Sequence, residues 1–136
     1  MKSPAPAAEA AVVDASALVD LFVAPALGQA VKSAMAKYSS IHAPAHVDAE
    51  VLSALGRLHR AGALTAREVA SHLGQLATAP IERHDLPPLL AGAWRRRDRM
   101  RLQDALYVEL SEATDATLLT TDAKLALAAG VEPVIP

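Results

Sequence analysis

The stretch Ala10-Ala11-Val12-Val13-Asp14-Ala15-Ser16-Ala17-Leu18 decides the fold. It opens with a short, uninterrupted apolar run that ends in two β-branched valines, which is typical of a strand buried on both faces. Ser16 is the expected cap of the helix that follows, in which apolar residues recur at helical spacing as far as Phe22. A buried strand that passes directly into a helix predicts a parallel sheet covered by helices.

The rest of the chain repeats this alternation. Further strands are expected at 40–44, 81–83, 117–120 and 134–135. The expected helical segments lie between them, at 17–24, 27–38, 47–61, 65–76, 86–97, 102–110 and 123–129. One of these begins with the capping-box pair Thr65 and Glu68. The order predicts an α/β fold with a small, mostly parallel sheet flanked by helices.

Length and composition limit the classes of protein. The chain has 136 residues, 52% of them apolar, which is enough for one core; we expect a frayed lead-in at 1–9 and a single domain at 10–136. The absence of cysteine excludes disulfides and thiolate metal sites and is compatible with the cytoplasm. No apolar run approaches the roughly 20 residues of a membrane-spanning helix. With a net charge of −2, nucleic-acid contacts require a local basic patch.

Four acidic residues occupy positions that suit a shared site. Asp14 and Asp122 each follow a predicted strand, and Glu50 and Asp104 lie near the starts of predicted helices. In open α/β sheets, ligands bind beyond the carboxyl ends of the strands. Gathered carboxylates repel one another, and a hard divalent cation such as Mg²⁺, which prefers oxygen ligands, removes that repulsion. The pattern therefore yields a set of candidate ligands for such a cation.

Position alone leaves this set open. An acidic residue near a helix N-terminus is commonly a cap or solvated surface, because it interacts favourably with the helix dipole. On a helical wheel, Asp48 projects closer to the middle of the apolar stripe than Glu50 does. Other acidic residues are not dismissed by position either: Asp20, Asp85, Asp98, Glu109 and Asp115.

Four motifs, in order, resemble those of the PIN-domain ribonucleases, and their spacing is similar to that of the VapC toxins of bacterial toxin–antitoxin pairs. The resemblance covers residues 11–135. The motifs are Val12-Val13-Asp14-Ala15-Ser16-Ala17-Leu18, Pro44 with Val47-Asp48-Ala49-Glu50-Val51-Leu52-Ser53-Ala54-Leu55, Asp104-Ala105-Leu106-Tyr107-Val108-Glu109-Leu110, and Leu118-Leu119-Thr120-Thr121-Asp122.

The resemblance implies a PIN-like three-layer fold and a metal-dependent endoribonuclease that acts as a toxin. Its catalytic and metal-binding quartet corresponds to Asp14, Glu50, Asp104 and Asp122, so the resemblance prefers Glu50 to Asp48. Mg²⁺, or Mn²⁺ as an alternative, is the expected cofactor. Ser16 and Thr120 correspond to supporting hydroxyl positions. The resemblance also implies a homodimer, an RNA substrate and a VapB-like antitoxin protein that blocks the cleft.

A basic run precedes the third motif. The run Trp94-Arg95-Arg96-Arg97-Asp98-Arg99-Met100-Arg101 holds five arginines and is interpreted as a phosphate-binding rim for RNA, represented by Arg95, Arg96 and Arg97; a solvated helix end is the alternative. The five histidines share no ligand spacing along the chain. Of these, His42 and His46 flank the second motif, and we expect both to have ordinary structural roles.

Two other functions compete with the ribonuclease. A PIN-like RNA- or protein-binding module with weak or no catalysis is the first, and the presence of all four acids argues against it. The second is a phosphoacceptor receiver domain, which requires an acceptor Asp after a middle strand. No Asp follows a convincing strand near the middle of the chain, which disfavours the receiver.

Overall fold

The computed structural model describes residues 9–136; residues 1–8, most of the predicted lead-in, lie outside the described part. Its sheet has four parallel strands in the order β3-β2-β1-β4. Their bounds are Ala10–Val13 for β1, Ser40–Pro44 for β2, Ile81–His84 for β3 and Thr117–Leu119 for β4. The predicted α/β class is therefore confirmed, and the strands lie within a residue of their predicted limits.

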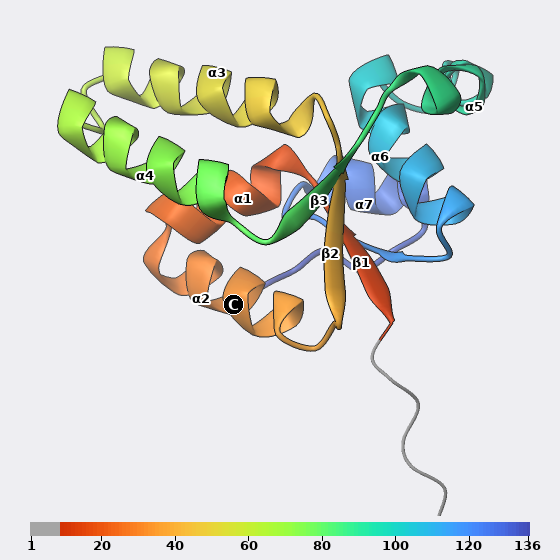
Figure 1. The fold of residues 1–136 in the computed structure, drawn as a ribbon, viewed down its shortest axis with the longest axis horizontal. Helices are drawn as coiled ribbons and strands as arrows, with labels where there is room; N and C mark the ends of the chain where they lie inside the picture. Colours follow the sequence, from red (N-terminus) through yellow and green to blue (C-terminus); the bar gives the residue numbers. More distant parts are fainter. Residues whose placement is uncertain (1–8) are drawn as a thin grey trace, which may run out of the picture.

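Helices connect the strands and cover both faces of the sheet. Figure 1 shows α1 to α4 on one side of the strands and α5 and α6 on the other, which is the predicted three-layer arrangement. The helices are α1 (Ala15–Val23), α2 (Pro25–Met35), α3 (Val47–Arg60), α4 (Ala66–Thr78), η1 (Pro87–Leu89, a 3₁₀ turn), α5 (Leu90–Arg95), α6 (Leu102–Ala113) and α7 (Ala123–Ala129).

Local sequence explains where several helices begin and end. Pro25 is the first residue of α2, where its missing N–H is tolerated. The predicted capping box is confirmed, because Thr65 Oγ1 accepts from the Glu68 N–H and the Glu68 carboxylate accepts from the Thr65 N–H. Gly130 ends α7 with φ of 72°, a left-handed conformation that favours glycine.

Small aliphatic side chains fill the core. Val12, Val13, Leu18 and Leu55 are among the fully buried residues, and Tyr107 is the largest. Because β1 is a central strand with neighbours on both sides, its apolar run is buried on both faces, as the sequence predicts. The aliphatic core fixes the ends of β1 and β4, which carry the site described below.

Two predicted elements differ from the structure. Residues 134–135 form no strand; instead, the Val134 N–H donates a single hydrogen bond to Thr120 O at 2.8 Å. The predicted helix at 86–97 divides into η1 and α5: Pro87 and Pro88 have no backbone N–H, and the Leu89 N–H donates to Leu86 O at 2.8 Å, which is a 3₁₀ hydrogen bond. Among the described residues, no helix combines the length and apolar character needed to cross a membrane.

Candidate active site

Asp14 lies directly after β1 and is held by hydrogen-bond donors from two strand ends. Its Oδ1 accepts from the Ala17 N–H at 2.9 Å, and Thr120 Oγ1 donates to its Oδ2 at 2.6 Å. Ser16 Oγ lies 2.8 Å from both carboxylate oxygens. Asp14, not Ser16, is therefore the N-cap of α1, which corrects the sequence prediction; the Ser16 hydroxyl instead supports the carboxylate.

Burial makes the charge of Asp14 unfavourable. Only 4% of the residue is exposed. The pKa of this carboxyl is raised from 3.8 to about 6, because desolvation, with a smaller contribution from the charge of Asp122, outweighs the hydrogen bonds from Thr120, Ala17 and Ser16. The hydrogen bonds alone do not compensate for the buried charge, and a bound cation would do so.

Glu50 lies in the first turn of α3, where α6 and the segment before α3 position it. The Tyr107 hydroxyl donates to Glu50 Oε1 at 2.5 Å, and His46 Nε2 lies 3.2 Å from the same oxygen. His46 Nε2 also contacts Gln103 O at 3.1 Å, and because a carbonyl oxygen only accepts, this nitrogen carries the hydrogen. The His46 ring packs on the Tyr107 ring at a centroid distance of 4.7 Å.

Tyr107 stays protonated beneath this carboxylate. Burial, followed by its hydrogen bond to Glu50 and the negative charges of Glu50 and Asp14, raises the pKa of the phenol far above its usual value. Tyr107 therefore acts as a permanent hydrogen-bond donor that fixes one oxygen of Glu50.

Asp104 and Asp122 complete the predicted quartet. Asp104, in the first turn of α6, accepts from Arg101 Nε at 3.1 Å and Nη2 at 3.3 Å. This ion pair raises the pKa of the Arg101 guanidinium, so the arginine keeps its charge. Asp122 caps α7 by accepting from the N–H groups of Lys124 and Leu125. The Asp122 N–H in turn donates to Thr120 Oγ1, which links Asp122 to Asp14.

All four predicted acids line one cavity of about 500 Å³. They come from four segments that are widely separated in the sequence. Ser16 lines the same cavity, whereas Thr120 is fully buried behind Asp14. The sheet and the first turns of α3 and α6 thus bring together the residues that the resemblance selects.

The same cavity contains residues outside the predicted set. Arg57 and Tyr107, which the sequence analysis missed, line it together with His46, which was expected to have an ordinary structural role, and Arg101, the last arginine of the basic run. A signal for two of them is present in the sequence, because Arg57 lies two helical turns after Glu50 and Tyr107 follows Asp104 by three positions. Residues at such spacing share a helix face with the acid, so they extend its surface.

Asp48 lies outside the cavity lining. Its carboxylate accepts hydrogen bonds from Arg83 Nε at 3.2 Å and from Arg83 Nη2 at 2.9 Å. The same guanidinium donates to the carbonyl oxygens of Leu76, Ala79 and Ile81 near the end of α4 and the start of β3. Asp48 therefore joins α3 to the α4–β3 connection, and its inward position on the helical wheel reflects this contact.

The predicted arginine rim divides in the structure. Arg96 is buried, donates to Gly92 O and forms ion pairs with Glu109 and Glu112 of α6. Arg95 and Arg97 are exposed, and the Arg97 guanidinium lies 4.7 Å from the Trp94 ring centroid. None of the three lines the cavity of the acids. Arg96 therefore has no free guanidinium for a phosphate.

The donor set of the cavity fits a hard divalent cation. Carboxylate oxygens from the quartet are the ligands that Mg²⁺ and Mn²⁺ prefer, and the raised pKa of Asp14 marks the buried negative charge that such an ion would neutralise. Asp14 and Asp104 would hold the ion, with Glu50 and Asp122 completing its surroundings. Arg101 contacts Asp104 at the same wall.

Comparisons with known proteins identify the family of this chain. The family model described as "PIN domain" matches residues 11–131. Ribonuclease VapC3 of Mycobacterium tuberculosis is 55% identical over 127 residues, which cover 93% of this chain and 92% of that relative. Ribonuclease VapC12 of the same organism is 32% identical over 124 residues, which cover 88% of this chain and 92% of that relative.

Two solved structures share the fold at low sequence identity. PAE2754 from Pyrobaculum aerophilum superposes with a TM-score of 0.71 at 23% identity, over 93% of this chain and 84% of that one. FitAcB from Neisseria gonorrhoeae superposes with a TM-score of 0.64 at 16% identity, over 92% of this chain and 96% of that one. The match to the family model and the identity to the mycobacterial relatives place the chain in the PIN domain family, among its VapC-type ribonucleases.

Proposed function

We propose that this protein is a metal-dependent endoribonuclease and the toxin of a toxin–antitoxin pair. The observation that carries the proposal is the cavity in which Asp14, Glu50, Asp104 and Asp122 meet two guanidinium groups, those of Arg57 and Arg101. Carboxylates that can hold a cation beside arginines that can contact phosphate suit the metal-assisted hydrolysis of a phosphodiester. The names of the mycobacterial relatives, both ribonucleases, support the same substrate class.

The polar residues in and behind the cavity take different tasks in this reaction. A bound Mg²⁺ or Mn²⁺ supplies activation of water and neutralisation of phosphate charge. Glu50 accepts the proton of the attacking water; Tyr107 and His46 both contact its Oε1, so Oε2 is the oxygen left for that proton. Arg57 and Arg101 hold the phosphates of the RNA strand. Ser16 and Thr120 keep the Asp14 carboxylate in place.

Growth on induced expression tests the cellular role. Wild-type protein should arrest growth, whereas Asp14→Asn should not, because an amide holds a cation weakly. Co-expression of the neighbouring upstream open reading frame should restore growth if it encodes the antitoxin. Arrest by both the wild type and the Asn variant would contradict a nuclease toxin that acts through this cavity.

Cleavage by purified protein tests the chemistry. Excess EDTA should stop cleavage of RNA, and Mg²⁺ or Mn²⁺ should restore it, whereas Zn²⁺ alone should restore little, because an all-oxygen site favours hard ions. Cleavage that continues in excess EDTA would point to a metal-free mechanism. RNA binding without cleavage under all these conditions would favour the binding-module alternative.

The proposed partners follow from the same function. A VapB-like antitoxin would inhibit the enzyme by covering the acidic cavity, and we propose that the toxin acts as a homodimer in the cytoplasm, where its RNA substrate is found. A further structural neighbour is a toxin–antitoxin complex from Klebsiella pneumoniae, and it supports the proposal of an antitoxin partner. Co-purification of the toxin with the upstream gene product, followed by measurement of the mass of the complex, tests both partners.

A further inference from the structure

A second cluster of metal-ligating side chains lies on the edge strand pair β2 and β3, away from the acidic cavity. The two strands pair in parallel with His42 opposite Glu82 and Pro44 opposite His84. Residues opposite one another in a parallel pair, and residues two apart in one strand, point to the same face of the sheet. His42, Glu82 and His84 therefore share one face, and none of them lines the cavity of the acids.

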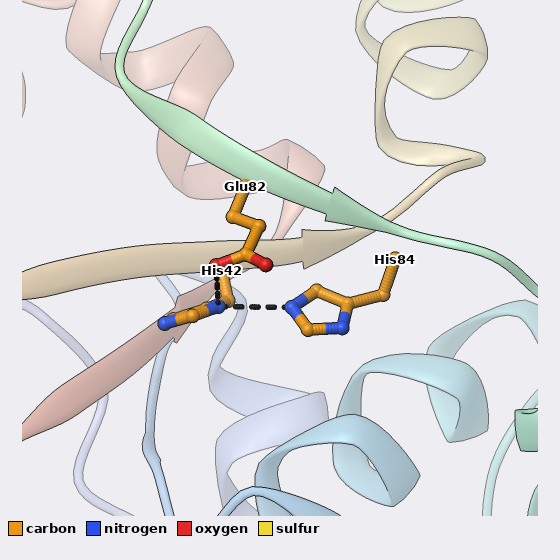
Figure 2. Close-up of side chains that lie close together, drawn as sticks. All are labelled: His42, Glu82 and His84. Atoms are coloured by element: carbon orange, nitrogen blue, oxygen red, sulfur yellow. Dashed lines mark hydrogen bonds and ion pairs between the residues drawn. The ribbon is translucent and has the colours of Figure 1, made fainter.

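The three side chains converge on a common point, as Figure 2 shows. His42 Nδ1 lies 2.9 Å from His84 Nε2 and 3.3 Å from Glu82 Oε2. One ligand atom from each residue lies within 4.8 Å of the other two, and this is the only such group of three or more His, Cys, Asp or Glu among residues 9–136. The His42 and His84 rings are tilted rather than stacked, at 47° to each other.

We propose that His42 Nδ1, His84 Nε2 and Glu82 Oε2 form a binding site for Zn²⁺ that is separate from the acidic cavity. In tetrahedral zinc coordination, ligand atoms about 2.0–2.1 Å from the ion lie about 3.3 Å apart. The distance from His42 to Glu82 already has this value, and the two imidazoles need to separate by only about 0.4 Å. Two histidines and one glutamate also match a common ligand set for zinc, with a fourth position left for water.

A hydrogen bond behind the cluster supports this assignment. His42 Nε2 lies 2.9 Å from Ser40 Oγ, on the side of the ring opposite the cluster. When Nε2–H donates to this hydroxyl, the lone pair of Nδ1 faces His84 and Glu82. Ligating histidines are commonly oriented by such a contact through their second nitrogen. Ser40 Oγ can accept from Nε2–H, and the tautomer formed in this way is the one that a metal ion requires.

Exposure and ligand chemistry set the expected ion. The His42 side chain is 13% exposed and that of Glu82 is 68% exposed, so His42 is sheltered while an ion can approach from the carboxylate side. Imidazole nitrogen favours Zn²⁺ over Mg²⁺, whereas the carboxylates of the acidic cavity favour Mg²⁺. The protein therefore has two sites that select different ions, and zinc at the second site would clamp β3 to β2.

Direct binding to tag-free, EDTA-stripped protein tests the proposal. Zn²⁺ is titrated by calorimetry in excess Mg²⁺, which occupies the acidic cavity, and Co²⁺ is titrated in parallel to observe the visible absorption of tetrahedral cobalt. We expect one saturable equivalent and a rise of a few degrees in the thermal midpoint. His84→Ala and Glu82→Gln should each weaken binding at least about tenfold.

Matched variants separate this site from others. His59→Ala removes an exposed histidine that lies outside the cluster and whose Nδ1 contacts Leu64 O, and this variant should bind zinc as the wild type does. Asp14→Asn should also keep the zinc site, because it changes only the acidic cavity. Because Glu82 is exposed, Glu82→Gln should fold normally, so its affinity decides the matter even if His84→Ala is unstable. No saturable binding, or equal affinity in Glu82→Gln and the wild type, would overturn the proposal.

Discussion

Asp14 shows how a single residue can serve both the fold and the chemistry. As the N-cap of α1 it satisfies the Ala17 N–H, and the side chains of Ser16 and Thr120 hold it at the end of β1. Burial nevertheless raises the pKa of its carboxyl to about 6, so the folded protein disfavours the charged form that a cation requires. A residue chosen for stability alone would avoid this conflict, and stability is therefore expected to improve when the carboxylate is removed.

Replacement of Asp14 by Asn should stabilise the protein in a pH-dependent way when EDTA is present. The pKa is 3.8 unfolded and about 6 folded. Because the folded pKa is the higher one, the favourable contribution of the protonated carboxyl is present below pH 4 and is lost as the pH rises through 6. The stability advantage of the Asn variant over the wild type should therefore grow as the pH rises from 4 to 6. At neutral pH the advantage should be at most about 3 kcal/mol.

Chemical denaturation of both proteins from pH 4 to pH 7.5 measures this gain. Other titrating groups are common to the two proteins and cancel in the difference. Added Mg²⁺ is the control, because it should stabilise the wild type and leave Asp14→Asn unchanged. A stability difference that does not vary with pH would show that the buried charge is not what destabilises the wild type.

The pair Asp48 and Glu50 provides a second test at this scale. Glu50→Gln should lose cleavage, since a neutral amide accepts no proton from water. Asp48→Asn should retain most activity but lower the free energy of unfolding by about 1 kcal/mol, because it weakens the contact with Arg83 that joins α3 to the α4–β3 connection. Cleavage rates on one RNA at one Mg²⁺ concentration decide the matter. An inactive Asp48→Asn variant with an active Glu50→Gln variant would move the site to Asp48.

Among the elements, the junction of α5 and α6 departs most from what the sequence suggests. Consecutive arginines look like one basic surface, but Arg96 is the C-cap of α5 and its side chain is buried, while those of Arg95 and Arg97 are exposed. Arg96 faces Glu109 and Glu112, and a side chain at Gly92 would collide with the Glu109 carboxylate. Ion pairs of Arg96 therefore hold the end of α5 against α6, and Gly92 lets α5 lie close to Glu109.

Replacement of Arg96 by Ala should destabilise the protein more than it weakens RNA binding. It leaves the Glu109 carboxylate, whose side chain is only 16% exposed, without its partner, and breaking such a pair costs about 3 kcal/mol. Arg95→Ala is the matched control, because Arg95 is exposed and should change stability by less than about 0.5 kcal/mol. Thermal melts of the two variants give the comparison; equal midpoints would show that the Arg96 ion pairs contribute little.

Local patterns predicted the elements better than they predicted the contacts between them. The apolar run before Asp14 indicates a buried strand because burial on both faces leaves no polar alternation, and the Thr65–Glu68 pair indicates a helix start because both partners are three residues apart. The meeting of His42 and His84 depends on the pairing of β2 with β3, which involves residues 42 positions apart. Such long-range register leaves no periodic signal in one sequence.

At the scale of the whole molecule, a protein with a net charge of −2 is proposed to bind RNA, which is a polyanion. An acidic cavity repels RNA unless a bound cation and nearby arginines offset its charge. Arg57 and Arg101 reach the cavity from α3 and from the residue before α6, so two segments far apart in the sequence bring positive charge to one site. The attraction of the protein for RNA is therefore expected to be local and to depend on few side chains.

This argument predicts the salt dependence of RNA binding. In an Asp14→Asn background, which prevents cleavage, binding of a single-stranded RNA is measured over a range of salt concentrations. Arg57→Gln and Arg101→Gln should each weaken binding and reduce the slope of log K against log salt by about 0.7, the value for one lost phosphate contact on a single strand. Arg67→Gln changes an exposed arginine of α4 outside the cavity and should leave the slope unchanged.

The double variant Arg95→Gln/Arg97→Gln tests the remaining part of the predicted rim in the same titration. If only this double variant flattens the slope, the RNA follows α5 and does not enter along Arg57 and Arg101, because a phosphate contact changes the slope only where a cation meets the strand.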